Sequence, residues 1–143
     1  MPYPEQLIAP MRAELTALGA RELKTPAAVD EELGKPGTVL LVVNSICGCA
    51  AGKARPGVAM ALRGPHRPDV LATVFAGADM EATARARERL APYPPSSPSI
   101  GLFKDGRLVW MMERRQIEGQ DAPAIADQLK QAFEQFCGLG TSA

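Results

Sequence analysis

The residues that most directly suggest chemistry are two cysteines that flank one glycine, Cys47-Gly48-Cys49. They follow a continuous apolar run, 38–43, and precede a segment rich in Ala and Met that is typical of a helix. A helix N-terminus carries unpaired N–H groups and partial positive charge, which favour a thiolate over a thiol. We therefore predict that Cys47 is a nucleophile whose pKa lies below about 8.5, the value of an ordinary thiol. Lys53 and Arg55 follow in the same helix, where they add positive potential if they turn toward the sulfur.

The second cysteine suggests a redox pair. Residues separated by a single position reach the Cα separation of a disulfide, roughly 4.4–6.8 Å, only in a tight turn, and Gly48 supplies the backbone freedom for one. The ring is small, and its strain makes the disulfide easy to reduce. The pair is therefore expected to act as an oxidant or isomerase, with Cys47 attacking and Cys49 resolving the product or tuning the first thiol.

Two other interpretations of the cysteines are open at this stage. They could be small apolar residues that fill space at the end of a strand. They could also bind a metal with His66 and Cys137, but the one-residue spacing is shorter than in zinc knuckles and the chain has a single His. Thiol–disulfide exchange is favoured over both. Cys137 is interpreted as a packing residue and His66 as a surface group.

The surrounding pattern predicts an α/β fold in which a buried strand presents these cysteines. The run 38–43 does not alternate in polarity, which is typical of a central strand covered on both faces, and 69–75 predicts a second such strand. Helices between them predict a largely parallel arrangement with helices on both faces. Pro56 should distort the helix that follows the cysteines. The expected helices cover 4–18, 26–33, 53–62, 79–90 and about 121–136.

The second half of the chain adds a hairpin. Apolar runs at 100–103 and 108–112 flank Asp105-Gly106, a strong hairpin signal. A short strand is also expected at 21–24. The proline-rich stretch 92–99 is short enough to be an ordered loop. The sheet is therefore expected to be mixed, with antiparallel strands added to the parallel ones.

Length and charge limit the remaining possibilities. The chain has 143 residues, of which 46% are hydrophobic, so a single domain over 1–143 is expected. Sixteen basic and sixteen acidic residues give no net charge, which argues against nucleic-acid or membrane partners. No apolar run approaches the roughly 20 residues of a membrane span, and a cytoplasmic location is expected. Three basic residues, Arg85, Arg87 and Arg89, are interpreted as a solvated helix face.

The sequence resembles the bacilliredoxin family over nearly its whole length. The segment from Val43 to Pro56, with the motif Cys-Gly-Cys-Ala-Ala-Gly-x-Ala-Arg-Pro, carries most of the similarity. Further matching segments occur in the same order: His66-Arg67-Pro68, 74–77, Pro95-Ser96-Ser97-Pro98-Ser99, 102–104, 117–119 and Phe136-Cys137. One departure is Ile46, where a small polar residue is expected, and its bulk makes the surroundings of Cys47 drier.

The resemblance implies a thioredoxin-like three-layer fold with a mixed central sheet and an N-terminal helical extension, 1–20. It also implies that Cys47 attacks mixed disulfides between bacillithiol and client proteins, and that free bacillithiol, a disulfide reductase or Cys49 then resolves the adduct. Weak disulfide isomerase activity is implied as well. Bacillithiol is then a co-substrate, and no tightly bound cofactor or metal is expected. The alternative is a non-enzymatic redox sensor or thiol-binding module.

The resemblance further implies a substrate site around the cysteines. Pro98 is expected to be cis and to shape the groove beside Cys47, with Ser97 and Ser99 lining it. The predicted substrate-binding residues are Gly48, Arg55, Ser97 and Pro98.

Overall fold

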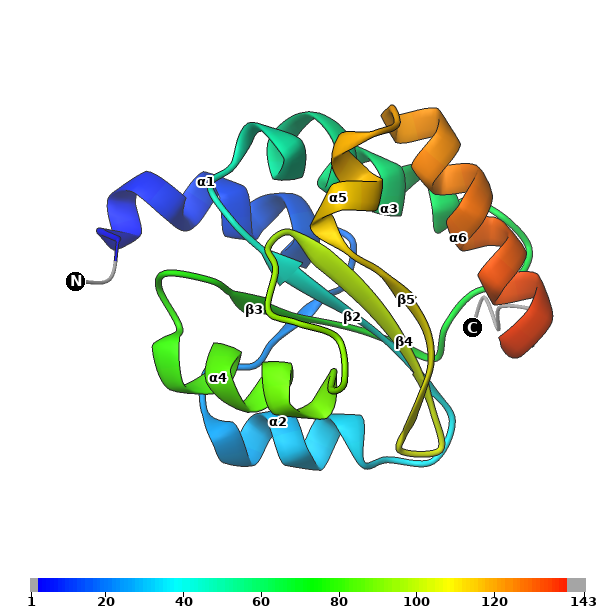
Figure 1. Ribbon diagram of the computed structural model, residues 1–143, viewed down its shortest axis with the longest axis horizontal. Coiled ribbons are helices and arrows are strands. Elements are labelled where there is room, and N and C mark those ends of the chain that lie inside the picture. Colours follow the sequence, from blue (N-terminus) through cyan, green and yellow to red (C-terminus); the bar gives the residue numbers. More distant parts are fainter. Residues whose placement is uncertain (1–2, 139–143) are drawn as a thin grey trace.

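The computed structural model describes residues 3–138 and is built around one mixed sheet (Figure 1). The strand order is β1-β3-β2-β4-β5, so β2 is central as predicted. β2 pairs in parallel with β3 and antiparallel with β4, and the hairpin strand β5 forms one edge. The strands are β1 Arg21–Glu22, β2 Thr38–Asn44, β3 Val70–Phe75, β4 Ser99–Lys104 and β5 Arg107–Met112.

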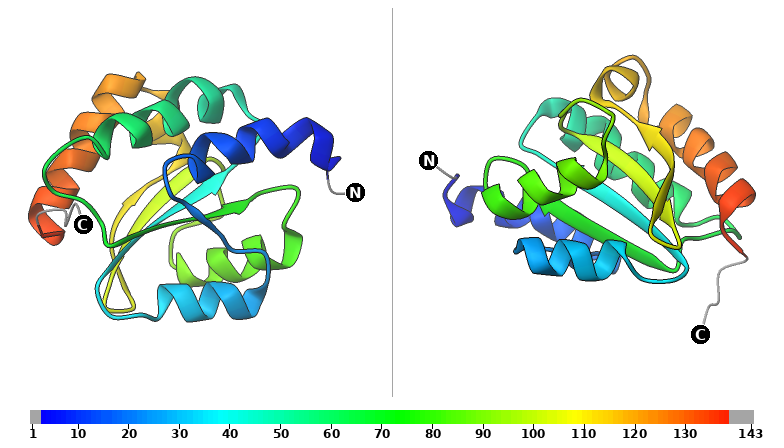
Figure 2. Two further views of the ribbon diagram at one scale, coloured as in Figure 1. Left: turned by 180° about the vertical axis from the view of Figure 1, so that it is seen from behind. Right: turned by 60° about the horizontal axis from the view of Figure 1, so that its bottom comes forward.

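Helices cover both faces of the sheet (Figures 1 and 2). α2 and α4 lie on one face, and α1, α3 and α6 lie on the other. Successive side chains of β2 enter opposite cores: Leu40 and Val42 pack with α3 and α6, and Leu41 packs with α2 and α4. The helical elements are α1 Glu5–Thr16, α2 Pro26–Leu33, the π-helix η1 Ala50–Ala54, α3 Arg55–Ala61, α4 Met80–Arg89, α5 Arg114–Glu118 and α6 Ala122–Phe136.

Several local signals in the sequence form as expected. The side chain of Thr25 accepts a hydrogen bond from the N–H of Ala28 and caps α2, and the side chain of Asp121 accepts one from the N–H of Ala124 and caps α6. Both helices have a proline at the first or second position. Asp105 and Gly106 have φ values of 51° and 83°, which fit the two-residue turn between β4 and β5.

The N-terminal helix is anchored by a buried arginine that the sequence did not single out. Arg12 is 8% exposed, and its guanidinium donates to both carboxylate oxygens of Asp79 at 2.9 and 2.8 Å. It also lies 5.3 Å from the centre of the Phe75 ring. Asp79 occupies the N-cap position of α4, but its side chain binds Arg12 and the N–H of Phe75 and makes no cap bond to the helix. Leu7, on the same N-terminal helix, is half exposed.

The arginines of α4 are not simply a solvated face. Arg85 and Arg89 both bind Asp30 of α2, at 2.9 and 3.0 Å, and link the two helices on that side of the sheet. Arg87 turns away from this pair and lines a cavity described below. Among residues 3–138, no helix is both long and apolar enough to cross a membrane.

Candidate active site

Cys47 occupies the N-cap position of the helix that follows β2. Its carbonyl accepts the first helical hydrogen bonds, from the N–H groups of Ala50 and Ala51 at 2.9 and 3.1 Å. Its sulfur accepts a bond from the N–H of Cys49 at 3.4 Å. A side-chain acceptor that takes a free N–H in the first helical turn is the normal device of an N-cap, and here the acceptor is sulfur. Cys47 therefore lies where the sequence analysis expected it.

The two thiols titrate in opposite directions. The N–H of Cys49 lowers the pKa of Cys47, and the Cys49 thiol, the charge of Arg114 and the N–H of Ala50 lower it further, against the opposing effect of desolvation. Burial and the neighbouring Cys47 raise the pKa of Cys49 above that of an ordinary thiol. This separation makes Cys47 the more readily ionised of the two thiols and Cys49 the one that holds its proton more strongly.

A buried arginine supports the cysteine loop from below. Arg55 is 3% exposed, and its Nη1 donates to the Asn44 side-chain oxygen and the Ser45 carbonyl, both at 2.9 Å. Ser45 in turn accepts a bond from the N–H of Cys47 at 3.1 Å. Nε of Arg55 lies 3.2 Å from a carboxylate oxygen of Glu14 on α1, close enough for an ion pair but without hydrogen-bond alignment. Arg55 therefore positions the loop and is too buried for the substrate contact expected of it.

The helix after the cysteines starts with a π-helical turn. The N–H of Arg55 bonds to the carbonyl of Ala50, five residues back, instead of four. Pro56 comes next and has no N–H to donate, so the chain changes its hydrogen-bond pattern just before it and continues as α3. The distortion predicted from Pro56 takes this form.

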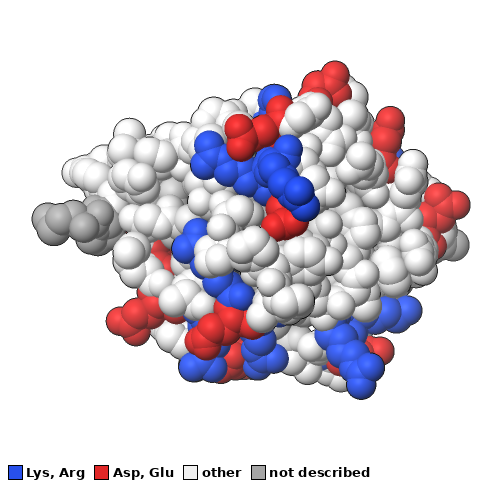
Figure 3. Space-filling model, viewed as in Figure 1, with Lys and Arg blue, Asp and Glu red and all other residues white. Residues whose placement is uncertain are grey.

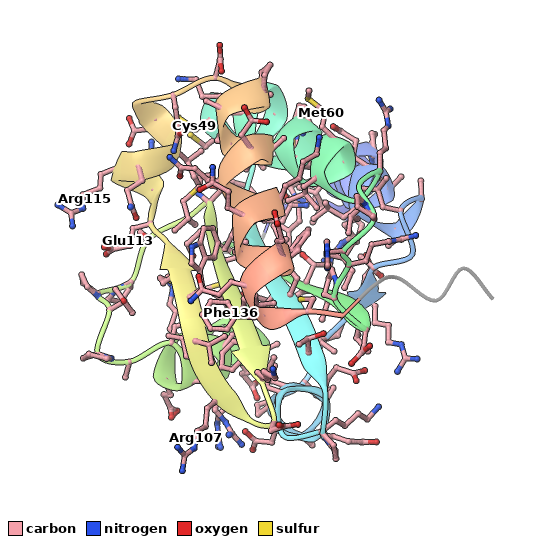
Figure 4. All side chains as sticks on the ribbon, turned by 90° about the vertical axis from the view of Figure 1, so that its right-hand side faces the viewer. Cys49, Met60, Arg107, Glu113, Arg115 and Phe136 are labelled. Carbon is pink, nitrogen blue, oxygen red and sulfur yellow. The ribbon has the colours of Figure 1, made fainter. Side chains whose placement is uncertain are left out.

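A short helix that the sequence analysis missed supplies the nearest cation. α5 begins at Arg114, directly after β5, and Lys53 of η1 donates to the Glu118 carbonyl at its end, at 2.6 Å. Arg114 itself bonds to Glu118 through Nε at 2.9 Å. The overlooked signal is Glu113 with Gln116, which bond each other's backbones as a capping box. Figure 4 shows Cys49 beside this helix.

Cys47 opens into a cavity of about 270 Å³. Its walls come from distant parts of the chain, including the first described residue, the loop after β2, the end of β3, and helices α4 and α5. The lining residues are Tyr3, Ser45, Ile46, Cys47, Ala76, Gly77, Arg87, Ser97 and Arg114. Of these, Cys47 and Ser97 are sequence-predicted site residues, and Tyr3, Arg87 and Arg114 were not expected here.

The proline loop reaches the site in part as expected. The Ser97–Pro98 peptide is cis, and Ser97 lines the cavity with Cys47. Pro98 is buried behind it, and Ser99 is 1% exposed and bonds to the Ser96 carbonyl, so it does not line the cavity as expected. The Ser97 carbonyl accepts a hydrogen bond from Nη1 of Arg114 at 3.2 Å.

Gly48 is exposed at the start of the helix with its surroundings open. A Cβ there would meet nothing within 4 Å, and its φ is not positive. The dithiol form therefore does not itself need a glycine between the cysteines. The conformational freedom expected of Gly48 belongs to the turn that closes a Cys47–Cys49 disulfide.

The other groups considered for a metal site lie elsewhere. All three cysteines are free thiols, and Cys137 is buried near Thr38, where β2 begins, whereas Cys47 follows the opposite end of that strand. His66 lies 3.4 Å from the Cys137 carbonyl. In the described part of the chain, no group of three or more His, Cys, Asp or Glu side chains is arranged to hold a metal ion.

Comparisons with known proteins agree with a thiol site on this fold. A family model described as disulphide isomerase matches residues 3–137. A bacilliredoxin of Cytophaga hutchinsonii is 56% identical over 134 residues, which cover 94% of this chain and 99% of that protein. A bacilliredoxin of Salinibacter ruber is 55% identical over 141 residues, 96% of this chain and 83% of that protein.

Solved structures with the same architecture are more distant in sequence. Thioredoxin of Fasciola hepatica superposes with a TM-score of 0.55 and 19% identity, covering 81% of this chain and 98% of that one. Mitochondrial thioredoxin 3 of Saccharomyces cerevisiae gives a TM-score of 0.56 and 15% identity, with 82% and 96% covered. At these identities the likeness establishes a thioredoxin-like fold.

Proposed function

The chain belongs to the bacilliredoxin family of thiol–disulfide oxidoreductases, and on this premise we propose that it removes bacillithiol from mixed disulfides on client proteins. The observation that carries the proposal is that the pKa values of the two neighbouring cysteines shift in opposite directions. Cys47 lines a cavity and has a lowered pKa, which favours its thiolate, whereas the pKa of the neighbouring Cys49 is raised, which favours its thiol. Thiol–disulfide exchange needs an attacking thiolate that a second thiol can later displace.

The first step transfers bacillithiol to the enzyme. The Cys47 thiolate attacks the bacillithiol sulfur of the mixed disulfide, a new sulfur–sulfur bond forms to Cys47, and the client leaves as a thiolate that takes up a proton from water. The N–H of Cys49 and Arg114 hold the attacking sulfur in its charged form before this step. Ser97 lies in the wall of the same cavity.

The second step regenerates the enzyme. Once Cys47 is in a disulfide, its negative charge is gone, and one of the causes that raises the pKa of Cys49 disappears. Cys49 then loses its proton more readily, attacks the Cys47 sulfur and expels bacillithiol, which leaves a Cys47–Cys49 disulfide. Free bacillithiol or a disulfide reductase supplies the two electrons that reopen it. The same exchange would give weak isomerase activity on other disulfides, and we place the reaction in the cytoplasm.

A turnover experiment tests the proposal. Catalytic amounts of the reduced protein are mixed with an S-bacillithiolated client and a reducing system, and bacillithiol release is followed by mass spectrometry. We expect many turnovers per enzyme, none with Cys47→Ser, and slower or bacillithiol-dependent turnover with Cys49→Ser. Exposed Arg63 provides a control, since Arg63→Gln should turn over normally.

The same turnover experiment has one outcome that contradicts the proposal. If the wild-type protein becomes modified once at Cys47 and releases nothing further, it is a thiol-based sensor and the enzymatic proposal fails.

A further inference from the structure

The cavity beside Cys47 carries an unusual charge distribution. Its lining contains two arginines, Arg87 from α4 and Arg114 from α5, and no Asp or Glu. The whole chain is neutral, so this concentration of positive charge is local. Figure 3 shows basic side chains over α5 and, lower in the same view, over α4. A small concave site with one sign of charge selects ligands of the opposite sign.

Among the described residues, Arg87 differs from the other two arginines of α4 in having no acidic partner. Its helix neighbours Arg85 and Arg89 both bind Asp30, yet Arg87 forms no ion pair with any residue of 3–138. Its Nε is buried and has no hydrogen-bond acceptor within the same range. A partly buried cation without a counter-charge is unfavourable, and a carboxylate of a ligand in the cavity would balance the charge of this guanidinium.

Arg114 is held in place but keeps donors for a ligand. Its Nε binds Glu118 at 2.9 Å and its Nη1 binds the Ser97 carbonyl at 3.2 Å. Its Nη2 makes no hydrogen bond among the described residues, and Arg114 lines the same cavity. Glu118 and Ser97 thus fix the orientation of a guanidinium, whose planar shape suits a carboxylate.

We propose that Arg87 and Arg114 bind the carboxylate groups of the low-molecular-weight thiol that becomes attached to Cys47. The inference rests on the proposed function and names the substrate feature that the cavity recognises: a small thiol that bears carboxylates. The volume of about 270 Å³ suits a small molecule. Tyr3, seated over Gly77 with its N–H bonded to the Gly77 carbonyl at 3.1 Å, forms a further part of the wall.

The chemistry is a balanced exchange. With a symmetrical small disulfide, the Cys47 thiolate attacks one sulfur, a bond forms between them, the original sulfur–sulfur bond breaks, and one thiolate leaves and is protonated by water. The attached half of the disulfide places its carboxylates beside the two arginines. Recognition therefore affects the rate with carboxylate-bearing disulfides and not with neutral ones.

The test compares two disulfides on the same protein. In a Cys49→Ser background, which stops the reaction at the adduct, the rate constants of adduct formation are measured with bacillithiol disulfide and with neutral hydroxyethyl disulfide. Arg87→Gln should lower the first rate constant by about five- to tenfold and leave the second within about twofold. Arg114→Gln should lower both, because it also affects the Cys47 thiolate, but it should lower the first more.

The matched control is Arg85→Gln, which removes the same charge from the same helix at a residue that binds Asp30. It should leave the ratio of the two rate constants unchanged. If Arg87→Gln keeps the parent ratio, or if Arg85→Gln changes it equally, the two arginines do not contact the ligand and the inference is overturned. Adduct formation with small disulfides does not require client turnover, so this result is independent of the test of the proposed function.

Discussion

At the scale of single residues, the site depends on two sulfurs in unlike surroundings. The Cys47 sulfur accepts a hydrogen bond from the N–H of Cys49, and the charge of Arg114 also lowers its pKa, whereas burial and the neighbouring Cys47 raise the pKa of Cys49. In the proposed mechanism, the same pair of residues provides an attacking group and a resolving group, and the residues that line the cavity include no Asp, Glu or His to act as a general base.

The first prediction concerns the order of the two pKa values. Alkylation by iodoacetamide should follow a pKa below about 8.5 for Cys47 in a Cys49→Ser variant, and above it for Cys49 in a Cys47→Ser variant. The pH dependence of each alkylation rate, read by mass spectrometry of the modified peptide, gives both values. The reverse order would contradict the roles assigned here.

A corollary of the first prediction is that the free energy of unfolding of the reduced protein depends on the ionisation of Cys47. Because the folded-state pKa of Cys47 is lowered, its thiolate stabilises the reduced fold fully above the unfolded-state pKa of about 8.5, and this contribution is lost as the pH falls through the folded value. Cys49 has the opposite sign, so the effect is measured in the Cys49→Ser background. Urea unfolding of that variant at several pH values should show a free energy of unfolding that decreases as the pH is lowered from the unfolded-state pKa through the folded-state pKa of Cys47. The decrease is measured relative to the Cys47→Ser,Cys49→Ser variant.

At the scale of single residues, the position of Cys47 in the fold could be predicted from the sequence. Cys47 could be placed at a helix start because a β-branched run, a small-residue turn and an Ala-rich segment are adjacent in the chain. The effect of Arg114 could not be seen, since it lies 67 positions away and reaches Cys47 only through the hairpin β4–β5 and α5. Arg55 was assigned to substrate because the sequence does not show which face of the helix is buried.

At the scale of elements, the cysteine loop is held by helix α1 as well as by its own strand. Asn44 donates to the Met11 carbonyl at 3.2 Å and accepts from Arg55, and Glu14 of α1 lies against the same arginine. The N-terminal helix is therefore connected to the loop before Cys47 through a buried polar network. Networks of this kind are sensitive to the loss of one member.

The second prediction tests this network. Arg55→Met removes the donor to Asn44 and to the Ser45 carbonyl and should lower the free energy of unfolding by about 2–4 kcal/mol. It should also shift the pH profile of Cys47 alkylation, because Ser45 no longer fixes the Cys47 N–H. Urea denaturation and alkylation report the two effects.

The control is Arg63→Met, which changes an exposed residue just after α3 and should alter stability by less than about 0.5 kcal/mol. An Arg55→Met protein as stable as this control would show that the network does not hold the loop.

The elements themselves were largely predictable, and the exceptions have physical reasons. Long apolar runs and helix caps located the strands β2 to β5 and the helices α2, α4 and α6 within a few residues. α5 is too short to show periodicity, and its cap Glu113 is not a preferred capping residue. The π-helical turn before Pro56 follows from the missing N–H, but its hydrogen-bond pattern depends on the surrounding packing.

At the scale of the whole molecule, the two ends of β2 have different roles. Cys47 follows one end, and Cys137 is buried against Thr38 at the other, within the core that includes α6. Seven residues of strand separate these ends, about 20 Å. Figure 4 shows Cys49 near the upper end of α6 and Phe136, which precedes Cys137 in the chain, near its lower end.

The third prediction follows from this distance. Oxidation of the protein should give a Cys47–Cys49 disulfide only, and Cys137→Ala should leave its rate of formation within about twofold, since disulfides require Cα atoms within about 7 Å. Peptide mapping after trapping free thiols identifies the pairs. An intramolecular bond that includes Cys137 would contradict the arrangement of the two ends.

The cavity shows what sequence reasoning could not supply. Its walls come from six separate stretches of chain, and only the stretch with Cys47 and that with Ser97 contain site residues predicted from the sequence. The sequence could not show that Arg87 has a different role from Arg85 and Arg89, because the three residues differ only in the direction in which their side chains leave α4. That difference is set by Asp30 on a neighbouring helix.

The position of Tyr3 has a practical consequence for handling this protein. Its backbone is tied to Gly77 and its ring lies in the wall beside the nucleophile. An affinity tag fused ahead of this tyrosine would emerge next to the reacting sulfur and obstruct the approach of bulky clients. Purification handles and surface-immobilisation linkers therefore belong after α6, on the far side of the molecule from the thiolate.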